Sequence, residues 1–171
     1  GNSLYIRPFV FANQAGVQAS PANKYKFLII CTPVKAYYSE NVNVLIAEKY
    51  SRAANGGVGF AKAAGNYAAQ FYPTSLAQKK GYEQIIWTDA NNHEYLEEAG
   101  TMNIFFRIGD NLITAPNNDR ILDGVTRKSI IDLCKYLKIN VEIRPISIKE
   151  LLSAYDNKSL IEIFGSGTAV V

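Results

Sequence analysis

The most informative stretch of this chain is GGVGFAKAAGNY, at residues 56–67. Glycines crowd its first half, so the backbone there is expected to turn. A single lysine, Lys62, follows that turn and precedes the predicted start of a helix. Lys62 is either a solvated surface residue or an amine that condenses with a carbonyl cofactor. The second function requires partner groups that hold the cofactor against the amine.

The composition is that of a globular protein with a core of ordinary size. The 171 residues are 48% hydrophobic and 19% charged, and the formal net charge is +3. Basic and acidic residues are scattered without a long run of one sign, which argues against a nucleic-acid partner. No apolar stretch approaches the roughly 20 residues that span a bilayer, and the first residues lack the pattern of a signal peptide. We therefore expect no membrane association and a cytoplasmic location.

Metal chemistry and a Ser-His-Asp triad have little support in this sequence. The chain contains two cysteines, Cys31 and Cys134, and a single histidine, His93. Both cysteines lie in apolar segments and are predicted to be small core residues. His93 lies in a polar turn and is predicted to be a surface residue. No metal site is expected.

The order of apolar patterns predicts a mixture of strands and helices. The run at 25–31 alternates little, as a strand covered on both faces would. Ser147 and Glu150 have the spacing of a capping box that begins a helix. The run GDN at 109–111, between two apolar segments, predicts a hairpin. The expected strands are residues 4–11, 25–31, 42–47, 85–87, 101–108, 112–115, 141–144 and 160–164, and the expected helices are residues 63–80, 124–137 and 148–154.

Three glycine-marked turns are candidate anion sites. The first is the turn at 56–59, before Lys62. The second, at 123–127, opens an amphipathic helix, where free backbone N–H groups and the helix dipole favour a phosphate. The third, at 165–168, offers backbone N–H groups and two hydroxyls. Glycines in turns usually serve backbone geometry alone, so each turn by itself is weak evidence.

Two adjacent acids, Glu97 and Glu98, lead directly into an apolar strand. Successive strand residues point to opposite faces, so one carboxylate can be solvated while the other turns inward. A buried carboxylate costs several kcal/mol unless it is paired. Its partner here is either the protonated ring nitrogen of a cofactor or an arginine elsewhere in the chain.

Four segments together resemble the branched-chain amino acid aminotransferases, which are pyridoxal-phosphate enzymes of fold type IV. In order and spacing they are KAAGNY at 62–67, LEEAGTMNIF at 96–105, GVTR at 124–127 and FGSGTA at 164–169. The opening SLYIRP at 3–8 is also similar to the family, so the resemblance covers essentially the whole chain. It implies an α+β fold, like that of D-amino acid aminotransferase, in which helices pack on a mixed sheet or pseudo-barrel, incomplete at both ends.

The resemblance implies a role for three residues around the ring of pyridoxal 5'-phosphate. Lys62 matches the catalytic lysine that binds the cofactor covalently and then moves a proton as general base and acid. Tyr67 matches the tyrosine that hydrogen-bonds the cofactor's phenolic oxygen. Glu98 matches the glutamate that faces the pyridine nitrogen and keeps it protonated, so that the ring acts as an electron sink.

The same resemblance implies binding residues at the two later turns. Val125, Thr126 and Thr168 match phosphate ligands, and Thr168 with Ala169 matches the turn that receives the substrate carboxylate. Asp123 stands where the family commonly has proline, and an acid there is unfavourable if it faces the phosphate. The implied substrates are amino acids and 2-oxo acids: leucine, isoleucine or valine with 2-oxoglutarate.

The resemblance also divides the chain into parts of a longer protein. Residues 1–34 match the last strands of the small domain, 35–42 a linker between domains, and 43–171 most of the large cofactor-binding domain. The rest of the small domain, which supplies an arginine to the phosphate and further substrate-binding residues, is missing from the chain. We therefore expect the isolated chain to be inactive or nearly so, and the whole enzyme to be a homodimer.

Two other classes of function remain open. A D-amino acid aminotransferase or an aminodeoxychorismate lyase would have the same fold, although the EAGTMN and AGNY runs favour the branched-chain type. A non-catalytic binding module on the same scaffold is the third possibility. The joint presence of Lys62, Tyr67 and Glu98 argues against such a module.

Overall fold

The computed structural model describes residues 3–34 and 41–168, and these residues form two units. The boundary between the units lies between Ser39 and Glu40, so that one unit is Gly1–Ser39 and the other Glu40–Val171. Most of the predicted linker, at 35–40, lies outside the described residues.

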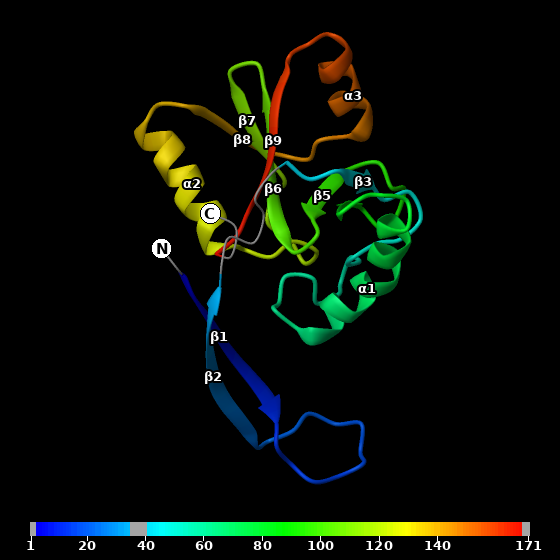
Figure 1. The fold of residues 1–171 in the computed structure, drawn as a ribbon, viewed down its shortest axis with the longest axis vertical. Coiled ribbons are helices and arrows are strands. Elements are labelled where there is room, and N and C mark those ends of the chain that lie inside the picture. Colours follow the sequence, from blue (N-terminus) through cyan, green and yellow to red (C-terminus); the bar gives the residue numbers. More distant parts are fainter. Residues whose placement is uncertain (1–2, 35–40, 169–171) are drawn as a thin grey trace. The chain divides into compact units, whose positions relative to one another are not determined.

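The first unit is a two-stranded antiparallel hairpin of β1 (Ser3–Ala12) and β2 (Tyr25–Val34), visible in blue in Figure 1. Both strands were predicted from their apolar and aromatic runs. The expectation that β2 is covered on both faces is wrong, because nearly all of its side chains are exposed. Cys31 is exposed for the same reason and is not a core residue, whereas Cys134 in the second unit is buried as predicted.

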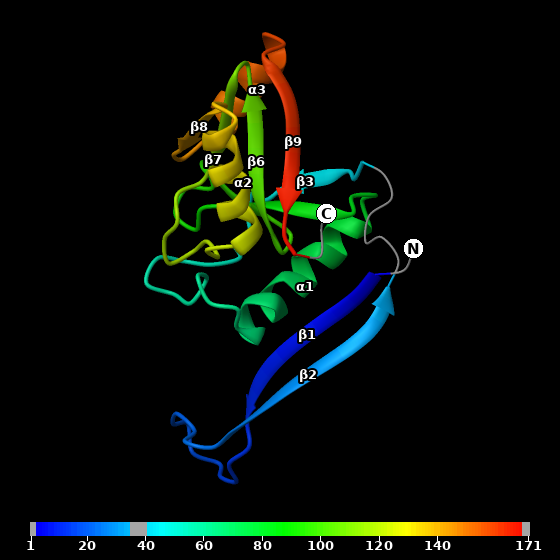
Figure 2. The same cartoon turned by 90° about the vertical axis from the view of Figure 1, so that its left-hand side faces the viewer.

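The second unit is built on a mixed sheet of seven strands within the described residues. The pairs β3–β4 and β7–β8 are parallel, and the remaining pairs are antiparallel. The predicted hairpin around GDN at 109–111 is confirmed, since β6 and β7 pair antiparallel across it. Figures 1 and 2 both show β9 alongside β6. The strands are β3 (Val44–Ile46), β4 (Gln84–Thr88), β5 (Leu96–Ala99), β6 (Met102–Ile108), β7 (Asn111–Thr114), β8 (Asn140–Ile143) and β9 (Leu160–Ser166).

The helices of the second unit agree with the predicted ones to within a few residues. They are α1 (Ala64–Gln78), α2 (Val125–Tyr136) and α3 (Ile148–Asp156). The Ser147 hydroxyl accepts a hydrogen bond from the Glu150 N–H at 3.0 Å, as the capping box predicts. None of the helices that the structure describes is long and apolar enough to cross a membrane.

Two apolar clusters hold the helices on the sheet. Near the β3 end, Ala77 of α1 packs with Ile85 and Trp87 of β4. Near the β7–β8 end, Ile131 and Cys134 of α2 pack with other apolar residues, among them Phe105 and Leu112. Figure 1 shows α1 and α2 beside these two ends of the sheet. A packed core therefore positions the segments that carry Lys62, Glu98 and the start of α2. The predicted α+β class is confirmed.

Candidate functional site

Lys62 lies on the segment between β3 and α1, and its side chain is exposed. The segment is tied to α1 by Asn66, which is buried and donates from Nδ2 to the carbonyl of Val58 at 2.8 Å and that of Ala61 at 2.9 Å. Tyr67 follows in the first turn of α1 and is half-buried. Lys62 has no hydrogen bond or ion pair with any other residue that the structure describes, so its amine is available to a ligand.

Glu98 is a buried carboxylate of the second unit, with 3% of its surface exposed. Its Oε1 accepts hydrogen bonds from Asn103 Nδ2 at 3.0 Å and from the Leu122 N–H at 2.9 Å. Its Oε2 lies 2.8 Å from Arg52 Nε. A carboxylate has about four lone-pair positions. One position therefore remains for a further donor.

Glu97 points to the other face of β5 and has a different partner. Its carboxylate pairs with the Arg120 guanidinium, and only 5% of the residue is exposed. The expectation that one of the two acids is solvated is wrong, because each has its own arginine and both can therefore be buried. An arginine was one of the two partners that the sequence analysis considered for a buried acid. The structure provides one arginine for each of the two carboxylates.

Burial raises the pKa of both carboxyl groups. The pKa of Glu98 is raised to about 7, against the lowering effect of the Arg52 charge and the Leu122 hydrogen bond. Burial also raises the pKa of Glu97, which Arg120 opposes. Lys62 is among the charges that lower the pKa of Glu98. The lysine and the carboxylate are therefore close enough to interact electrostatically.

Three buried polar residues form a row across the sheet. Glu98 of β5 is the register partner of Asn103 of β6, which is the register partner of Ser166 of β9. Directly paired residues on neighbouring strands share a face. Ser166 is 3% exposed, and its Oγ has no hydrogen-bond partner among the described residues. Residues 165 and 166, predicted to begin the third glycine turn, thus belong to β9 because they pair with β6, and the row joins Glu98 to this strand.

The start of α2 fits an anion. Its N-cap, Gly124, provides no side-chain hydrogen bond, which leaves the first helical N–H groups uncapped. Thr126 is half-buried, and Val125 is 70% exposed. Asp123 forms an ion pair with Lys128 and accepts a hydrogen bond from Asn117 Nδ2 at 2.5 Å. Its carboxylate is therefore already paired, which reduces the conflict expected with a phosphate.

Gly124 also packs directly on the polar row. A Cβ at Gly124 would lie 2.1 Å from Asn103 Oδ1, so glycine is required for this close approach. The start of α2 and the end of β9 thus converge on Asn103. Thr168 lies two residues beyond Ser166 and is exposed, while Ala169 lies outside the described residues.

Arg52 and Asn103 are the main residues of this site to which the sequence assigned no role. Asn103 lies inside a quoted motif, and its partner Glu98 is near in sequence. Arg52 lies in a polar segment before the glycine turn, and nothing local signals its ion pair with a distant strand. Arg127 is also buried and donates to the Ala115 carbonyl at 2.7 Å, and its Nε has no partner among the described residues.

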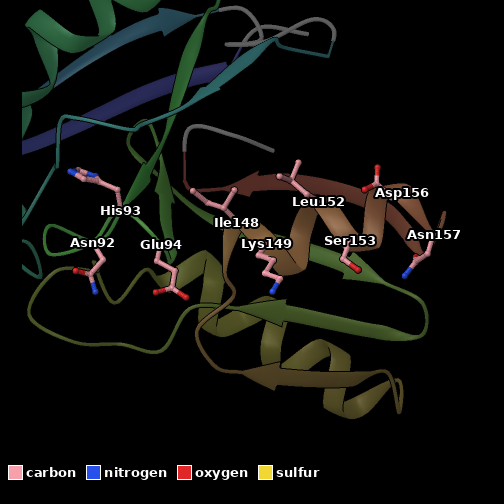
Figure 3. A pocket seen from close by; sticks show the side chains of 9 residues that line it. All are labelled: Asn92, His93, Glu94, Ile148, Lys149, Leu152, Ser153, Asp156 and Asn157. Carbon is pink, nitrogen blue, oxygen red and sulfur yellow. The ribbon is translucent and has the colours of Figure 1, made fainter.

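An open surface pocket lies elsewhere in the second unit. It has a volume of about 960 Å³ and is lined by the loop at 92–94 and by α3. Figure 3 shows the loop side chains on one side and the helix side chains on the other. His93 is half-buried there rather than fully on the surface, and its Nδ1 lies 2.8 Å from Thr88 Oγ1. The residues that line this pocket include none of the predicted site residues.

The family model for amino-transferase class IV matches residues 1–170. The chain therefore belongs to this family. The chain is 49% identical over 175 residues to the probable branched-chain-amino-acid aminotransferase of Staphylococcus aureus (strain N315), which it matches over 100% of its own length and 49% of that protein. It thus spans about half the length of the curated relatives that it matches.

Solved structures of similar proteins have the same fold. The branched-chain aminotransferase of Thermoproteus uzoniensis with norvaline has a TM-score of 0.85 and 27% identity, over 97% of this chain and 54% of that one. The branched-chain amino acid aminotransferase of Escherichia coli has a TM-score of 0.84 and 30% identity, with the same coverage. An aminotransferase of Brucella abortus bound to the co-factor PLP has a TM-score of 0.81 and 23% identity, over 97% of this chain and 57% of that one. The predicted fold type IV is thereby confirmed.

Proposed function

We propose that this chain is part of a pyridoxal-phosphate enzyme that transfers the amino group of leucine, isoleucine or valine to 2-oxoglutarate. The observation that carries the proposal is the environment of Glu98. This buried carboxylate is bonded to the segment before α2 through Leu122 and interacts electrostatically with Lys62. This cofactor needs three groups: a lysine that can bind it covalently, a buried acid for its ring nitrogen, and a helix start with free N–H groups for its phosphate. The similarity to branched-chain aminotransferases supports the choice of substrate.

The residues present fit the cofactor at several points. Glu98 has a free lone-pair position for the ring nitrogen, and Lys62 has an amine that no described residue holds, available for the aldehyde. Tyr67 would donate to the phenolic oxygen. The N–H groups of Val125 and Thr126 would bind the phosphate, because helix starts favour anions. When bound, the cofactor supplies an electron sink for the negative charge that develops at the substrate's α-carbon.

The chain's own residues then have separate tasks. Glu98 would direct its remaining lone-pair position at the ring nitrogen, because its other positions are held by Arg52, Asn103 and Leu122. Lys62 Nζ would take the proton from the substrate's α-carbon and hold it for return, acting as general base and then general acid. Thr168 and Ala169 are proposed to bind the substrate carboxylate, with Thr168 also contacting the phosphate.

The test is to find the lysine that binds the cofactor. Borohydride converts the reversible link between the cofactor and a lysine amine into a stable one. Applied to an enzyme of the relatives' full length that contains this sequence, followed by peptide mapping, it should label Lys62. Label on Lys79 or Lys128 would contradict the proposal, and Lys62→Ala should remove the label.

The alternatives predict different measurements. A D-amino acid aminotransferase would use D-amino acids in place of L-leucine, and a lyase would release product without a 2-oxo acid acceptor. A non-catalytic module would bind no pyridoxal phosphate and show no visible absorbance from it. The homodimer and the cytoplasmic location stay predictions.

A further inference from the structure

We propose that Arg52 is a positioning residue that holds the Glu98 carboxylate and the Lys62-bearing segment in one arrangement. The proposal rests on the proposed function, in which Glu98 faces the cofactor's ring nitrogen. It goes beyond that function because Arg52 itself is not expected to touch cofactor or substrate.

The Arg52 guanidinium joins three separate parts of the second unit. Its Nε lies 2.8 Å from Glu98 Oε2, with 7% and 4% of the two side chains exposed. Its other end donates to the carbonyl of Gly59 at 3.0 Å and to the carbonyl of Arg120. A planar guanidinium can satisfy several acceptors in fixed directions, which a lysine ammonium cannot do over the same span. Arg52 therefore fixes the relative placement of β5, the glycine turn and the turn before α2.

The backbone contact that Arg52 bridges is close. A Cβ at Gly59 would lie 2.7 Å from both the Cα and the carbonyl oxygen of Arg120, so the two backbones can meet only if residue 59 is glycine. Phe60 adds a hydrogen bond from its N–H to the Asp119 carbonyl at 3.0 Å. Lys62 comes directly after Ala61, whose carbonyl Asn66 holds, and shortly before Asn66 itself at the start of α1. The lysine thus lies between two fixed points.

Arg52 also controls the basicity of Glu98. Burial raises the pKa of this carboxyl, and Arg52 is the strongest influence in the opposite direction. Glu97 and Lys62 act on the same carboxyl more weakly, with opposite signs. Without the arginine, Glu98 would be a stronger base and would retain a proton that it otherwise leaves on the ring nitrogen. Arg52 therefore acts in two ways that can be tested separately. Its charge lowers the pKa of Glu98, and its hydrogen bonds to the two carbonyls hold the backbone segments together.

Two substitutions separate them. Arg52→Gln removes the charge. Arg52→Lys keeps the charge but loses the geometry, because one ammonium cannot reach Glu98 and both carbonyls. The measurements are the ¹⁵N chemical shift of a ring-labelled cofactor and the Kd of pyridoxal phosphate, both in the full-length enzyme. Arg52→Gln should move the ring-nitrogen signal toward its unprotonated position. Arg52→Lys should keep that signal and weaken cofactor binding about tenfold.

Arg120→Gln is the matched control, since it removes the cation that pairs with Glu97 instead of Glu98. It should lower thermal stability and leave the ring-nitrogen signal in place. If Glu98→Gln leaves the signal unchanged, the role of Glu98 in the proposed function is wrong. If Glu98→Gln moves the signal and Arg52→Gln does not, only the role of Arg52 is overturned. If Arg52→Gln does not fold, an unchanged Kd of pyridoxal phosphate in Arg52→Lys overturns the proposed role of Arg52.

Discussion

Glu97 and Glu98 show how two neighbouring residues of the same type acquire different roles. The pleat of β5 sends their side chains to opposite faces, and each carboxylate is paired with a different arginine. Removing one partner of a buried ion pair leaves an uncompensated charge, which costs roughly 3–5 kcal/mol. Each arginine is therefore required as much as the acid that it accompanies.

The raised pKa of Glu98 predicts a pH dependence of stability. Its carboxyl titrates near 4.5 when unfolded and at about 7 when folded. A group whose pKa is raised on folding stabilises the protein at low pH, and this contribution is lost as pH rises through the folded value. Between about pH 4 and pH 8, the free energy of unfolding should fall in the wild type. In Glu98→Gln this fall should be about 3 kcal/mol smaller than in the wild type.

The measurement is urea unfolding of the cofactor-free enzyme across this pH range. Glu94→Gln is the control, because Glu94 is exposed, and its pH profile should follow that of the wild type. Parallel profiles for Glu98→Gln and the wild type would show that Glu98 titrates normally in the folded state.

Sequence motifs found Lys62 and Glu98 because both lie in runs whose order and spacing are distinctive. They did not find the buried environment of Glu97, because alternation along a strand predicts opposite faces but not whether the second face is covered. The prediction that Cys31 is a core residue failed for the opposite reason. An apolar strand predicts burial, yet its hairpin leaves that cysteine exposed.

Elements with local signals at their ends were predicted most accurately. The start of α3 was recognised from Ser147 and Glu150, and the β6–β7 hairpin from its glycine turn. The order of strands in the sheet could not be predicted, because β9 pairs with β6 across two intervening helices and that pairing depends on tertiary packing.

Loss of the α3 cap should have a measurable cost. The Ser147 hydroxyl satisfies the Glu150 N–H, so Ser147→Ala should lower the free energy of unfolding by about 1 kcal/mol. Ser153→Ala, in the body of the same helix, is the control, and it should change stability by less. Equal effects of the two substitutions would mean that the cap contributes nothing specific.

Gly124 allows a sharper test of how the start of α2 is coupled to Glu98. The added Cβ of Gly124→Ala would lie 2.1 Å from Asn103 Oδ1 and displace the amide that bonds Glu98. We expect a loss of about 1–3 kcal/mol in stability together with weaker binding of pyridoxal phosphate. Thermal unfolding and cofactor titration of the full-length enzyme measure the two effects.

Gly65→Ala is the control for this substitution. No heavy atom lies within 4 Å of a Cβ at Gly65, and alanine favours a helix more than glycine does. Its stability should be equal to or higher than that of the wild type. If Gly124→Ala behaves in the same way, the contact with Asn103 is not important.

At the scale of the whole molecule, the two units differ in how well they bury their apolar side chains. The second unit has two packed clusters, whereas the hairpin of the first exposes most of its side chains. An isolated two-stranded hairpin is marginally stable at best in water. The division of residues 1–34, 35–42 and 43–171 between two domains and a linker stays a prediction. The exposed apolar side chains of the hairpin include Leu4, Ile6, Val10, Phe27, Leu28, Ile29 and Ile30.

We predict that the isolated 171-residue chain lacks leucine–2-oxoglutarate transamination and binds pyridoxal phosphate weakly or not at all. It should also self-associate, because exposed apolar surface and open strand edges favour association. A coupled transamination assay, cofactor titration and sedimentation measure the three properties. Activity of the isolated chain would contradict the prediction, and a purely monomeric chain would contradict its second part.

The turn between β5 and β6 has a further consequence for how this sequence can change. Gly100, at a φ of 56°, and Thr101 connect strands in which Ala99 pairs with Met102 and Glu98 with Asn103. A slip of one residue would send every β5 side chain to the opposite face. A one-residue insertion that kept a two-residue turn would therefore place Glu97 opposite Asn103, whereas one absorbed by a longer loop or a bulge would keep Glu98 there. The length of this turn therefore determines which of the two acids shares a face with the row.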